Sequence, residues 1–490
     1  MALSVCLFLT DFSRIRIVEN PCNLRLNVLY YTGCVNFKGD DEVENKRSSF
    51  TGKLGFVLAA AGSAVGLGNI WRFPYLAAKY GGGMFLLVYL ILSITFGFTL
   101  MVAEIAIGRK TGKSAIEAFK SLDKRFSFVG VLCAVIPIII LPYYSVIGGW
   151  VMKFMVGFAT GQSGAMADKD YFGSYIAGTV EPIVWFALFI GITAVVVLLG
   201  VQKGVEKVSK YMMPVLVVLT LFIACYTIFS MDGAMDGVVY YLKPDLSHFS
   251  VMTVVAAMGQ LFYSMSLAMG IMITFGSYTK KDISIEKSAR QIEWFDTGVA
   301  FLAGLMIIPA VFANGGDLKA GPTLMFQTLP TVFEKMPGGA AIGAIFFLMV
   351  FLAALTSSIS LMETIVSIIM DKFHIGRKTC CVAVLGFSLI LGIPSSLGFG
   401  IWDSVTVLGM SLLDFFDFIS NSVMMPIVAF ATCILIGFIL KPRVVTDEVE
   451  LNGKFKSKPM FNVMIKYIAP VCILVILASS VLSAFGIISI

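Results

Sequence analysis

The stretch GSAVGLGNIWRFP, from Gly62 to Pro74, decides how the sequence folds. It lies inside an apolar segment long enough to cross the roughly 30 Å hydrocarbon core of a membrane as one helix. Three glycines, the amide Asn69 and the cation Arg72 nevertheless stand where a membrane helix should be most regular. Small residues also let neighbouring helices pack closely, but such packing requires neither Asn69 nor Arg72. The stretch therefore predicts a break in a membrane-spanning helix.

The rest of the chain is equally apolar. Of its 490 residues, 58% are hydrophobic and 13% are charged, against about 25% charged in an average soluble domain. Runs long enough to span a membrane lie near residues 53–79, 84–107, 127–157, 181–200, 208–229, 251–278, 292–314, 339–370, 379–397, 411–440 and 464–488. The sequence therefore predicts an all-α polytopic protein with eleven transmembrane helices in a lipid bilayer.

The basic residues indicate how these spans are oriented. If Lys46 lies in the cytoplasm, 25 of the 36 lysines and arginines fall at cytoplasmic ends and loops, as the positive-inside rule requires. The N-terminus is then cytoplasmic and the C-terminus external. Topology accounts for the net charge of +6, so we predict no nucleic-acid partner. Nine scattered cysteines without a CxxC pair, and two histidines, predict no zinc or haem site.

A second interruption occurs in the sixth predicted span, at SMSLAMG from Ser264 to Gly270. The two interrupted helices begin successive sets of five, and an odd number per set makes the second set enter the membrane from the opposite side. The prediction is a 5+5 inverted repeat with a binding site at the midplane. Its parts are an N-terminal tail or mis-assigned start (1–45), a first repeat (46–230), a second repeat (251–440), a cytoplasmic loop (441–463) and an eleventh helix (464–490).

A broken helix has a chemical use inside a membrane. Unwinding exposes peptide groups to hydrocarbon, which costs several kcal/mol for each group unless a polar partner meets it. Carbonyls released from the inner half are hard oxygen ligands for a small cation, while amides at the start of the outer half favour a carboxylate. The two breaks therefore predict a site for a cation and a zwitterion.

Five motifs, in order, carry a resemblance to a known family. They are GSAVGLGNIWRFPY with GGG at 81–83 and Glu104, GQLFYSMSLAMG at 259–270, FDTGVAFLAG at 295–304, LTSSISLME at 355–363 and DFFD at 414–417. Over about residues 46–440 the chain resembles the neurotransmitter:sodium symporters, whose bacterial members share the LeuT fold and often have eleven helices. The resemblance implies a sodium-coupled amino acid symporter in the plasma membrane of a bacterium.

The resemblance also implies two sodium sites made of oxygen donors, as a hard cation requires. The first combines the substrate carboxylate with the positions of Ala64, Asn69, Ser264 and Asp296. The second corresponds to Gly62, Val65, Ala353, Thr356 and Ser357. The alternative for the last two hydroxyls is a bond to the carbonyl four residues earlier in their own helix.

Asp296 departs from the pattern of the chloride-dependent members. Those members resemble this chain at Tyr89, Gln260 and Ser264, but they have an asparagine in place of Asp296 and a serine in place of Ala300. A carboxylate beside the ion supplies the negative charge that chloride otherwise brings. We therefore predict sodium dependence without chloride.

The substrate pocket implied by the resemblance is apolar. It corresponds to Leu67, Gly68, Ile140, Tyr144, Tyr263, Ser266, Met269, Ser357 and Leu361. The substrate carboxylate is expected on the amides near Leu67 and Gly68 and on the Tyr144 hydroxyl, and the ammonium on nearby carbonyls of the second break. Met269 stands where the leucine-transporting member has a phenylalanine, and methionine favours aromatic contacts. The expected substrate is a bulky hydrophobic or aromatic amino acid, although Met269 can equally be core packing.

Charged residues near the ends of the spans resemble two gates. Arg72 and Asp417 match the outer gate, with Tyr263 as a lid. Arg47 and Asp371 match the inner gate, with Tyr278 as a neighbour and Glu363 in place of a glutamine; Arg47 has the alternative role of a positive-inside anchor. Glu104 is expected to accept hydrogen bonds from the unwound backbone.

Three other functions stay open at this point. A carrier of another solute on the same scaffold would also contain two broken helices. A channel would require a ring of like groups, and no filter-like repeat occurs. An intramembrane enzyme would require a motif such as HExxH or GxSxG, and neither is present. The protein is predicted to be a monomer or a weak homodimer.

Overall fold

The computed structural model describes residues 49–314 and 322–484, and the regular secondary structure in this part of the chain is helical apart from one isolated bridge. The predicted tail at 1–45 and Arg47 lie outside the described residues. The broken first span consists of α2 (Lys53–Ala64), the π-helical turn η1 (Gly68–Arg72) and α3 (Phe73–Lys79), which bend by 56° at the break. The predicted interruption in this span is therefore present.

Nine helices among the described residues are long and apolar enough to cross a membrane. In chain order, the first seven are α4–α5 (Gly83–Thr111), η3–α7 (Lys124–Ala159), α10 (Glu181–Leu198), η4–α11 (Val201–Ser230), α15 (Ile285–Ala313), α17 (Gly339–Phe373) and α18 (Arg377–Leu397). The last two are α19–α20 (Leu412–Ile439) and α22–α23 (Lys458–Ala484). The bent pair α2–α3 raises the number to ten.

The sixth predicted span is divided into two short helices. These are α13 (Val251–Ser264) and α14 (Ile271–Ser277), and neither is long enough to cross a membrane alone. A membrane-spanning helix needs about 20 residues, so the break itself shortens both pieces below that length. The count of eleven spans stays a prediction for this reason.

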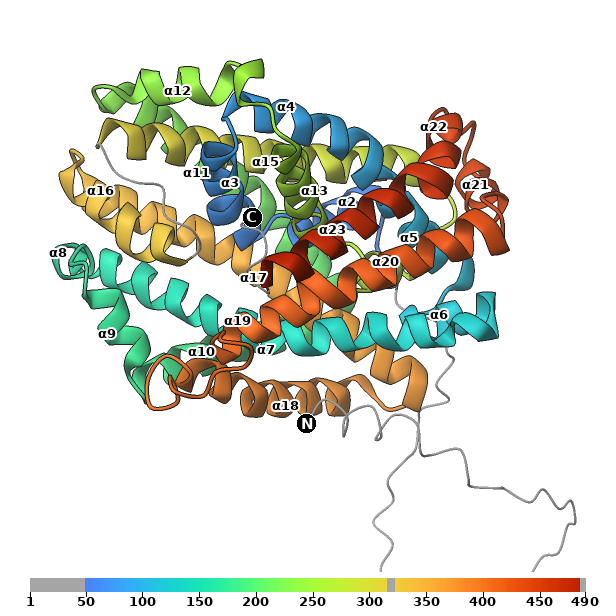
Figure 1. Cartoon of the computed structure of the whole chain (residues 1–490). Helices are drawn as coiled ribbons and strands as arrows, with labels where there is room; N and C mark the ends of the chain where they lie inside the picture. Colours follow the sequence, from blue (N-terminus) through green and yellow to red (C-terminus); the bar gives the residue numbers. More distant parts are fainter. Residues whose placement is uncertain (1–48, 315–321, 485–490) are drawn as a thin grey trace, which may run out of the picture. The chain divides into compact units, whose positions relative to one another are not determined.

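Short helices occupy the connections between the spans. They are α6 (Ala115–Leu122), α8 (Ser163–Met166), α9 (Tyr171–Ala177), α12 (Ala234–Leu242), α16 (Leu329–Lys335) and α21 (Arg443–Glu450). Figure 1 shows α12 and α4 on one side of the bundle and α18 on the opposite side. The long helices α7 and α17 pack along each other, and α2 packs on α11, α15 and α17. The break after α2 therefore faces helices from both predicted repeats.

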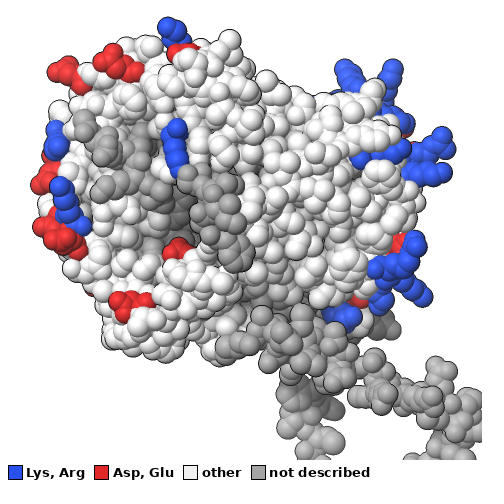
Figure 2. Space-filling view, viewed as in Figure 1, with Lys and Arg blue, Asp and Glu red and all other residues white. Residues whose placement is uncertain are grey.

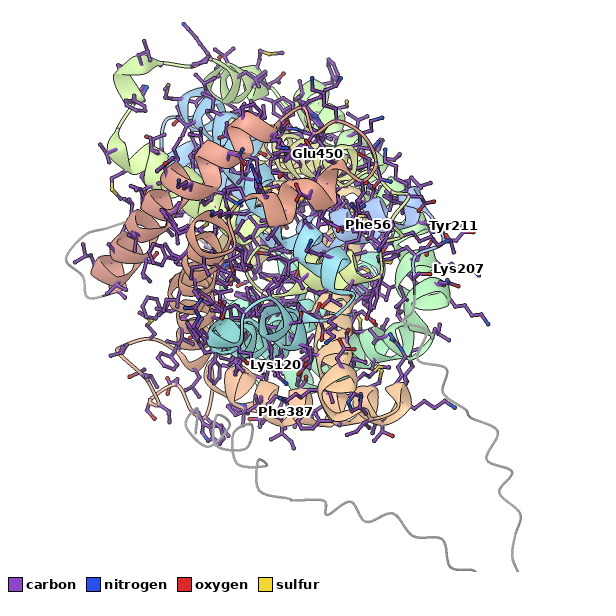
Figure 3. The ribbon with its side chains drawn as sticks, turned by 90° about the vertical axis from the view of Figure 1, so that its right-hand side faces the viewer. Phe56, Lys120, Lys207, Tyr211, Phe387 and Glu450 are labelled. Carbon is purple, nitrogen blue, oxygen red and sulfur yellow. The ribbon has the colours of Figure 1, made fainter. Side chains whose placement is uncertain are left out.

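Basic side chains gather over one end of the bundle. Figure 2 shows most visible Lys and Arg at the end where Figure 1 places α6, α21 and α22. Figure 3 looks onto this end, where Lys120 on α6, Lys207 on α11 and Glu450 on α21 are labelled. The asymmetry agrees with the positive-inside rule if this end faces the cytoplasm.

A buried arginine holds three chain segments together at the same end. Arg109, in the last turn of α5, donates from Nε to Oε1 of Glu448 on α21 at 2.8 Å. Its Nη1 donates to the carbonyl of Ile283 at 2.5 Å and to Oδ1 of Asn452 at 3.1 Å, and its Nη2 bonds the Glu448 carbonyl. The loop predicted at 441–463 therefore includes a helix that is fastened to α5.

Candidate functional site

The first break is short and is closed by one side chain. Val65, just after α2, has an extended backbone (φ −72°, ψ 106°), and Gly66 follows it outside any helix. Asn69 accepts a hydrogen bond from the Gly66 amide through Oδ1 at 3.0 Å, and its own amide donates to the Gly66 carbonyl at 3.2 Å. The Asn69 side chain therefore replaces part of the missing helical hydrogen bonding.

The second break is longer and contains strained backbone. Between α13 and α14, Ser266 and Ala268 have left-handed φ values of 52° and 62°, which side-chain-bearing residues rarely adopt. The Ala268 amide donates to Oε1 of the buried Glu104 at 2.6 Å. Strain of this kind, of order 1–3 kcal/mol, persists where surrounding structure enforces it, and it is concentrated at functional sites. Glu104 thus accepts a hydrogen bond from unwound backbone, as its sequence position suggested for the second break.

The two breaks contact each other directly. The Ser266 hydroxyl donates to the Ser63 carbonyl at 2.9 Å, and Gln260 Nε2 donates to the Gly68 carbonyl at 3.0 Å. Because these bonds join segments about two hundred residues apart in the sequence, the unwound parts of both predicted repeats line one space.

A carboxylate with neutral partners is buried beside this space. Asp296, on α15, is 0% exposed. Its Oδ1 accepts hydrogen bonds from Asn69 Nδ2 at 2.7 Å and from the Ser264 hydroxyl at 2.8 Å, and its Oδ2 accepts from Tyr89 at 3.4 Å. In the part of the chain that the structure describes, no basic side chain lies within 4.0 Å of it. A buried charge normally has a counter-ion, so the cluster of Asn69, Ser264 and Asp296 suits a cation.

The residues predicted for the second ion site also converge. The Ser357 hydroxyl, on α17, donates to the Ser63 carbonyl at 3.1 Å and the Val65 carbonyl at 3.2 Å, and lies 3.4 Å from the Gly62 carbonyl. Thr356 Oγ1 donates to the carbonyls of Leu352 and Ala353, both at 3.1 Å, which is the alternative bonding within its own helix. The end of α2 and the middle of α17 thus present carbonyl and hydroxyl oxygens to each other, a donor set that suits Na⁺.

A cavity lies between the breaks and α7 and α17. Its free space, counted with the part that is open to solvent, is about 430 Å³. All nine residues predicted for the substrate line it, together with Ala64, Asn69 and Ser264. The remaining lining residues are Ser63, Gly66, Ile271 and Asn421, which sequence reasoning missed. The buried Tyr144 hydroxyl has no hydrogen-bond partner among the described residues and is free to donate to a carboxylate.

The two charged residues of the predicted outer gate are not in contact with each other. The Arg72 guanidinium stacks over the Tyr263 ring, 5.2 Å from its centroid. Asp417 accepts hydrogen bonds from Asn421 at 2.7 Å and from the Tyr143 hydroxyl at 3.0 Å. No ion pair within 4.0 Å joins Arg72 to Asp417, both of which are described. Sequence reasoning missed Tyr143 and Asn421, although Asn421 lies one helical turn after Asp417.

Among the described residues of the predicted inner gate, Glu363 is the centre of a group of hydrogen bonds. It is 0% exposed and accepts hydrogen bonds from Tyr278 at 2.9 Å and from Arg377 Nη1 at 3.1 Å, with a second contact to Arg377 Nη2. Arg377 also donates to the Val197 carbonyl at 2.9 Å and 2.8 Å. Asp371 accepts a hydrogen bond from the Ser114 amide at 2.7 Å. Sequence reasoning identified Glu363 but missed Arg377.

Gly68 provides a direct test of how closely the lid packs. A Cβ at this position would lie 2.5 Å from Cε1 of Tyr263, closer than real contacts allow. We expect Gly68→Ala to displace the Tyr263 ring and to weaken substrate binding about tenfold, with a calorimetric titration as the measurement. The matched control is Gly259→Ala, where an added Cβ meets nothing within 4 Å. Equal affinities in the two variants would show that the ring is not held against η1.

Taken together, two broken helices, oxygen-lined candidate ion sites and a central cavity define a membrane transporter. The model of the Sodium:neurotransmitter symporter family matches residues 47–163 and 176–486. The chain therefore belongs to this family, which consists of transporters and not of enzymes. It is a multi-pass membrane protein that performs sodium-coupled symport, so the predictions of the family and of the LeuT-type fold are confirmed.

Individual relatives are similar to this chain over most of its length. The chain is 34% identical over 441 residues to the uncharacterised sodium-dependent transporter YhdH of Bacillus subtilis, covering 88% of this chain and 97% of that protein. It is 24% identical to the human sodium- and chloride-dependent GABA transporter 2, covering 88% of this chain and 80% of that protein. The crystal structure of MhsT in complex with L-phenylalanine has a TM-score of 0.81 and 36% identity, covering 89% of this chain and all of MhsT.

Proposed function

We propose that the protein imports a hydrophobic or aromatic amino acid together with two sodium ions, by alternating access and without chloride. The observation that carries this proposal is Asp296, a fully buried carboxylate that has only neutral partners, two of which, Asn69 and Ser264, line the cavity. A sodium ion at Asn69, Ser264, Asp296 and the Ala64 carbonyl neutralises that charge. A substrate carboxylate in the cavity completes its coordination.

The residues that line the cavity favour one orientation of the bound amino acid. Its carboxylate lies against the amides of Leu67 and Gly68 and the unpartnered Tyr144 hydroxyl. Its ammonium meets carbonyls of the second break near Tyr263 and Ser266. Its side chain points toward Ile140, Met269 and Leu361, which are apolar, and the complex of the relative MhsT with L-phenylalanine supports an aromatic substrate. Because the substrate carboxylate also binds the first sodium ion, each ligand increases the affinity of the other.

Two sodium ions are sufficient to drive strong accumulation. Moving one charge through 100 mV releases about 2.3 kcal/mol, so two ions with a zwitterion release about 4.6 kcal/mol before any concentration gradient. At about 1.4 kcal/mol per tenfold, this supports an accumulation of roughly a thousandfold. The second ion is assigned to Gly62, Val65, Ala353, Thr356 and Ser357, which join α2 to α17.

A binding screen tests the proposal. Purified protein is titrated with the twenty amino acids in sodium salt and again in potassium salt. We expect phenylalanine, tyrosine, tryptophan or leucine to bind in sodium and to bind at least tenfold more weakly in potassium. Equal affinity in both salts contradicts sodium coupling, whereas sodium-dependent binding of only small or charged solutes contradicts the assigned substrate.

Chloride independence requires a separate measurement. Asp296 places a negative charge where Tyr89 and Ser264 also point, and Ala300 offers no hydroxyl to an anion. We expect equal initial rates of uptake by proteoliposomes in sodium chloride and in sodium gluconate. A several-fold lower rate in gluconate would contradict the prediction, because it would mean that Asp296 does not replace the anion.

A further inference from the structure

A second cavity lies far from the substrate site, at the end of the bundle where basic side chains gather. It is enclosed by the end of η8 (Leu435–Ile439), by α21 and by the start of the helix α22–α23. Its free space is about 1,060 Å³, including space open to solvent. Neither predicted ion site and no predicted gate residue contributes to its lining.

The lining is strongly basic. Four cationic side chains and one acidic side chain contribute to it, namely Lys441, Arg443, Lys458, Lys466 and Asp447. Lys458 is already paired with Glu450 at 2.8 Å, and Lys466 lies 5.8 Å from the centre of the Phe438 ring. Lys441 and Arg443 have no carboxylate within 4.0 Å among the described residues. The cavity therefore contains positive charge that no carboxylate in the described ranges neutralises through an ion pair.

Two polar side chains in the lining also lack partners. The Thr446 hydroxyl is buried, on a residue that is 1% exposed, and no described atom accepts or donates a hydrogen bond to it. The Asn462 side-chain oxygen is buried without a partner as well. Burying a polar group without a hydrogen bond costs about 1–3 kcal/mol in proteins. A hydroxyl can donate to an anionic oxygen, so an anionic ligand would satisfy Thr446, whereas the Asn462 oxygen can only accept a hydrogen bond.

The surroundings place the cavity at the level of lipid headgroups. Phe438 and Gly437 line it at the end of one membrane-spanning helix, and Lys466 lies near the start of the next. Phe438 is 50% exposed and Tyr467 is 57% exposed, as expected for apolar side chains that face lipid rather than water. Aromatic and basic residues commonly meet at the boundary between hydrocarbon and headgroups.

We propose that this cavity binds the phosphate headgroup of an anionic phospholipid from the cytoplasmic leaflet. Lys441 and Arg443 neutralise the phosphate, Thr446 donates a hydrogen bond to one of its oxygens, and the acyl chains run along Phe438 into the hydrocarbon. The bound lipid would join α20 (Met425–Ile434), through its continuation η8, to α21 and α22 (Lys458–Val463). This site is independent of the amino acid substrate.

Native mass spectrometry of the full-length protein tests the proposal. The protein is mixed with equal amounts of phosphatidylglycerol and phosphatidylcholine, and we expect it to retain mainly phosphatidylglycerol. Each basic side chain near an anionic headgroup contributes about fivefold to affinity. The double variant Lys441→Gln/Arg443→Gln should therefore retain phosphatidylglycerol at least fivefold less. Lys454→Gln is the matched control, since Lys454 is exposed in the same loop but does not line the cavity.

Two further experiments test the role of the Thr446 hydroxyl and the source of the phosphate group. Thr446→Val should lower phosphatidylglycerol retention, whereas Thr446→Ser should keep it. Equal retention of both lipids, or equal loss in the double variant and in Lys454→Gln, overturns the proposal. If excess inorganic phosphate displaces the lipid and itself binds with the same dependence on Lys441 and Arg443, the site binds a soluble anion and the lipid assignment is overturned.

Discussion

The variant Asp296→Asn is expected to weaken sodium-dependent substrate binding about a hundredfold. The carboxylate accepts hydrogen bonds from Asn69, Ser264 and Tyr89, and it is the one acidic group in the predicted first ion site. An interaction with a charged partner contributes about 1.5–3 kcal/mol, which corresponds to roughly 10- to 150-fold in affinity. The measurement is the sodium concentration that gives half-maximal substrate binding, in chloride-free buffer.

A neighbouring polar residue provides the control for Asp296. Thr297 follows it on α15 and is also buried, but its hydroxyl pairs with Ser93 at 2.9 Å instead of with the cluster. Thr297→Val should change the sodium requirement by less than about fivefold, the cost of one neutral hydrogen bond. In Asp296→Asn, added chloride should restore part of the lost affinity, because an anion can supply the missing charge. An unchanged sodium requirement in Asp296→Asn would exclude this carboxylate from the ion site.

Glu363→Gln is expected to have the largest effect on stability. The substitution leaves Arg377, whose side chain is 19% exposed, without its carboxylate partner. Removing one member of a buried ion pair costs about 3–5 kcal/mol, and the lower end applies here because Arg377 is partly accessible to water. We expect a lower thermal midpoint and a weaker substrate affinity, since the pair fastens α17 to α18 on the side of the predicted inner gate.

A double-mutant cycle makes this expectation specific. Glu363→Gln/Arg377→Gln removes both charges and should be more stable than Glu363→Gln alone, because no uncompensated charge then remains buried. The control is Glu117→Gln, which breaks the pair between Lys120 and Glu117 on α6, where the lysine side chain is 47% exposed. Exposed pairs contribute about 0–1 kcal/mol, so this variant should resemble the wild type. Additive losses in the double variant would contradict a coupled pair.

Motifs made the centre of the molecule predictable from sequence. Close helix packing explains glycine and serine in the middle of a membrane span, but it does not explain Asn69 and Arg72 beside them. These two residues therefore already indicated a break. The nine predicted substrate residues converge on one cavity because each belongs to a short motif or lies on a helix that faces the breaks. Ion and substrate binding at these residues stays a prediction, since geometry alone shows proximity.

Other contacts had no local sequence signal. Arg109 and Glu448 are 339 positions apart, and Arg377 and Val197 are 180 apart, so only the folded packing brings them together. The sequence SMSLAMG indicated that the sixth span is divided, but hydropathy cannot show that the two helices α13 and α14 have only 14 and 7 residues. Side-chain pairs of this kind depend on helix rotation and register, which an apolar pattern leaves open.

The hydrogen bonds of Arg109 also suggest how the conformational changes of transport can be measured. One guanidinium ties the end of α5 to the turn that precedes α15 and to α21, all within hydrogen-bond distance. We therefore expect these three segments to move together during turnover and to supply a fixed frame of reference. Spectroscopic probes placed within that frame should report an invariant distance during turnover, and displacements measured from it to α17 or α18 record the cycle itself.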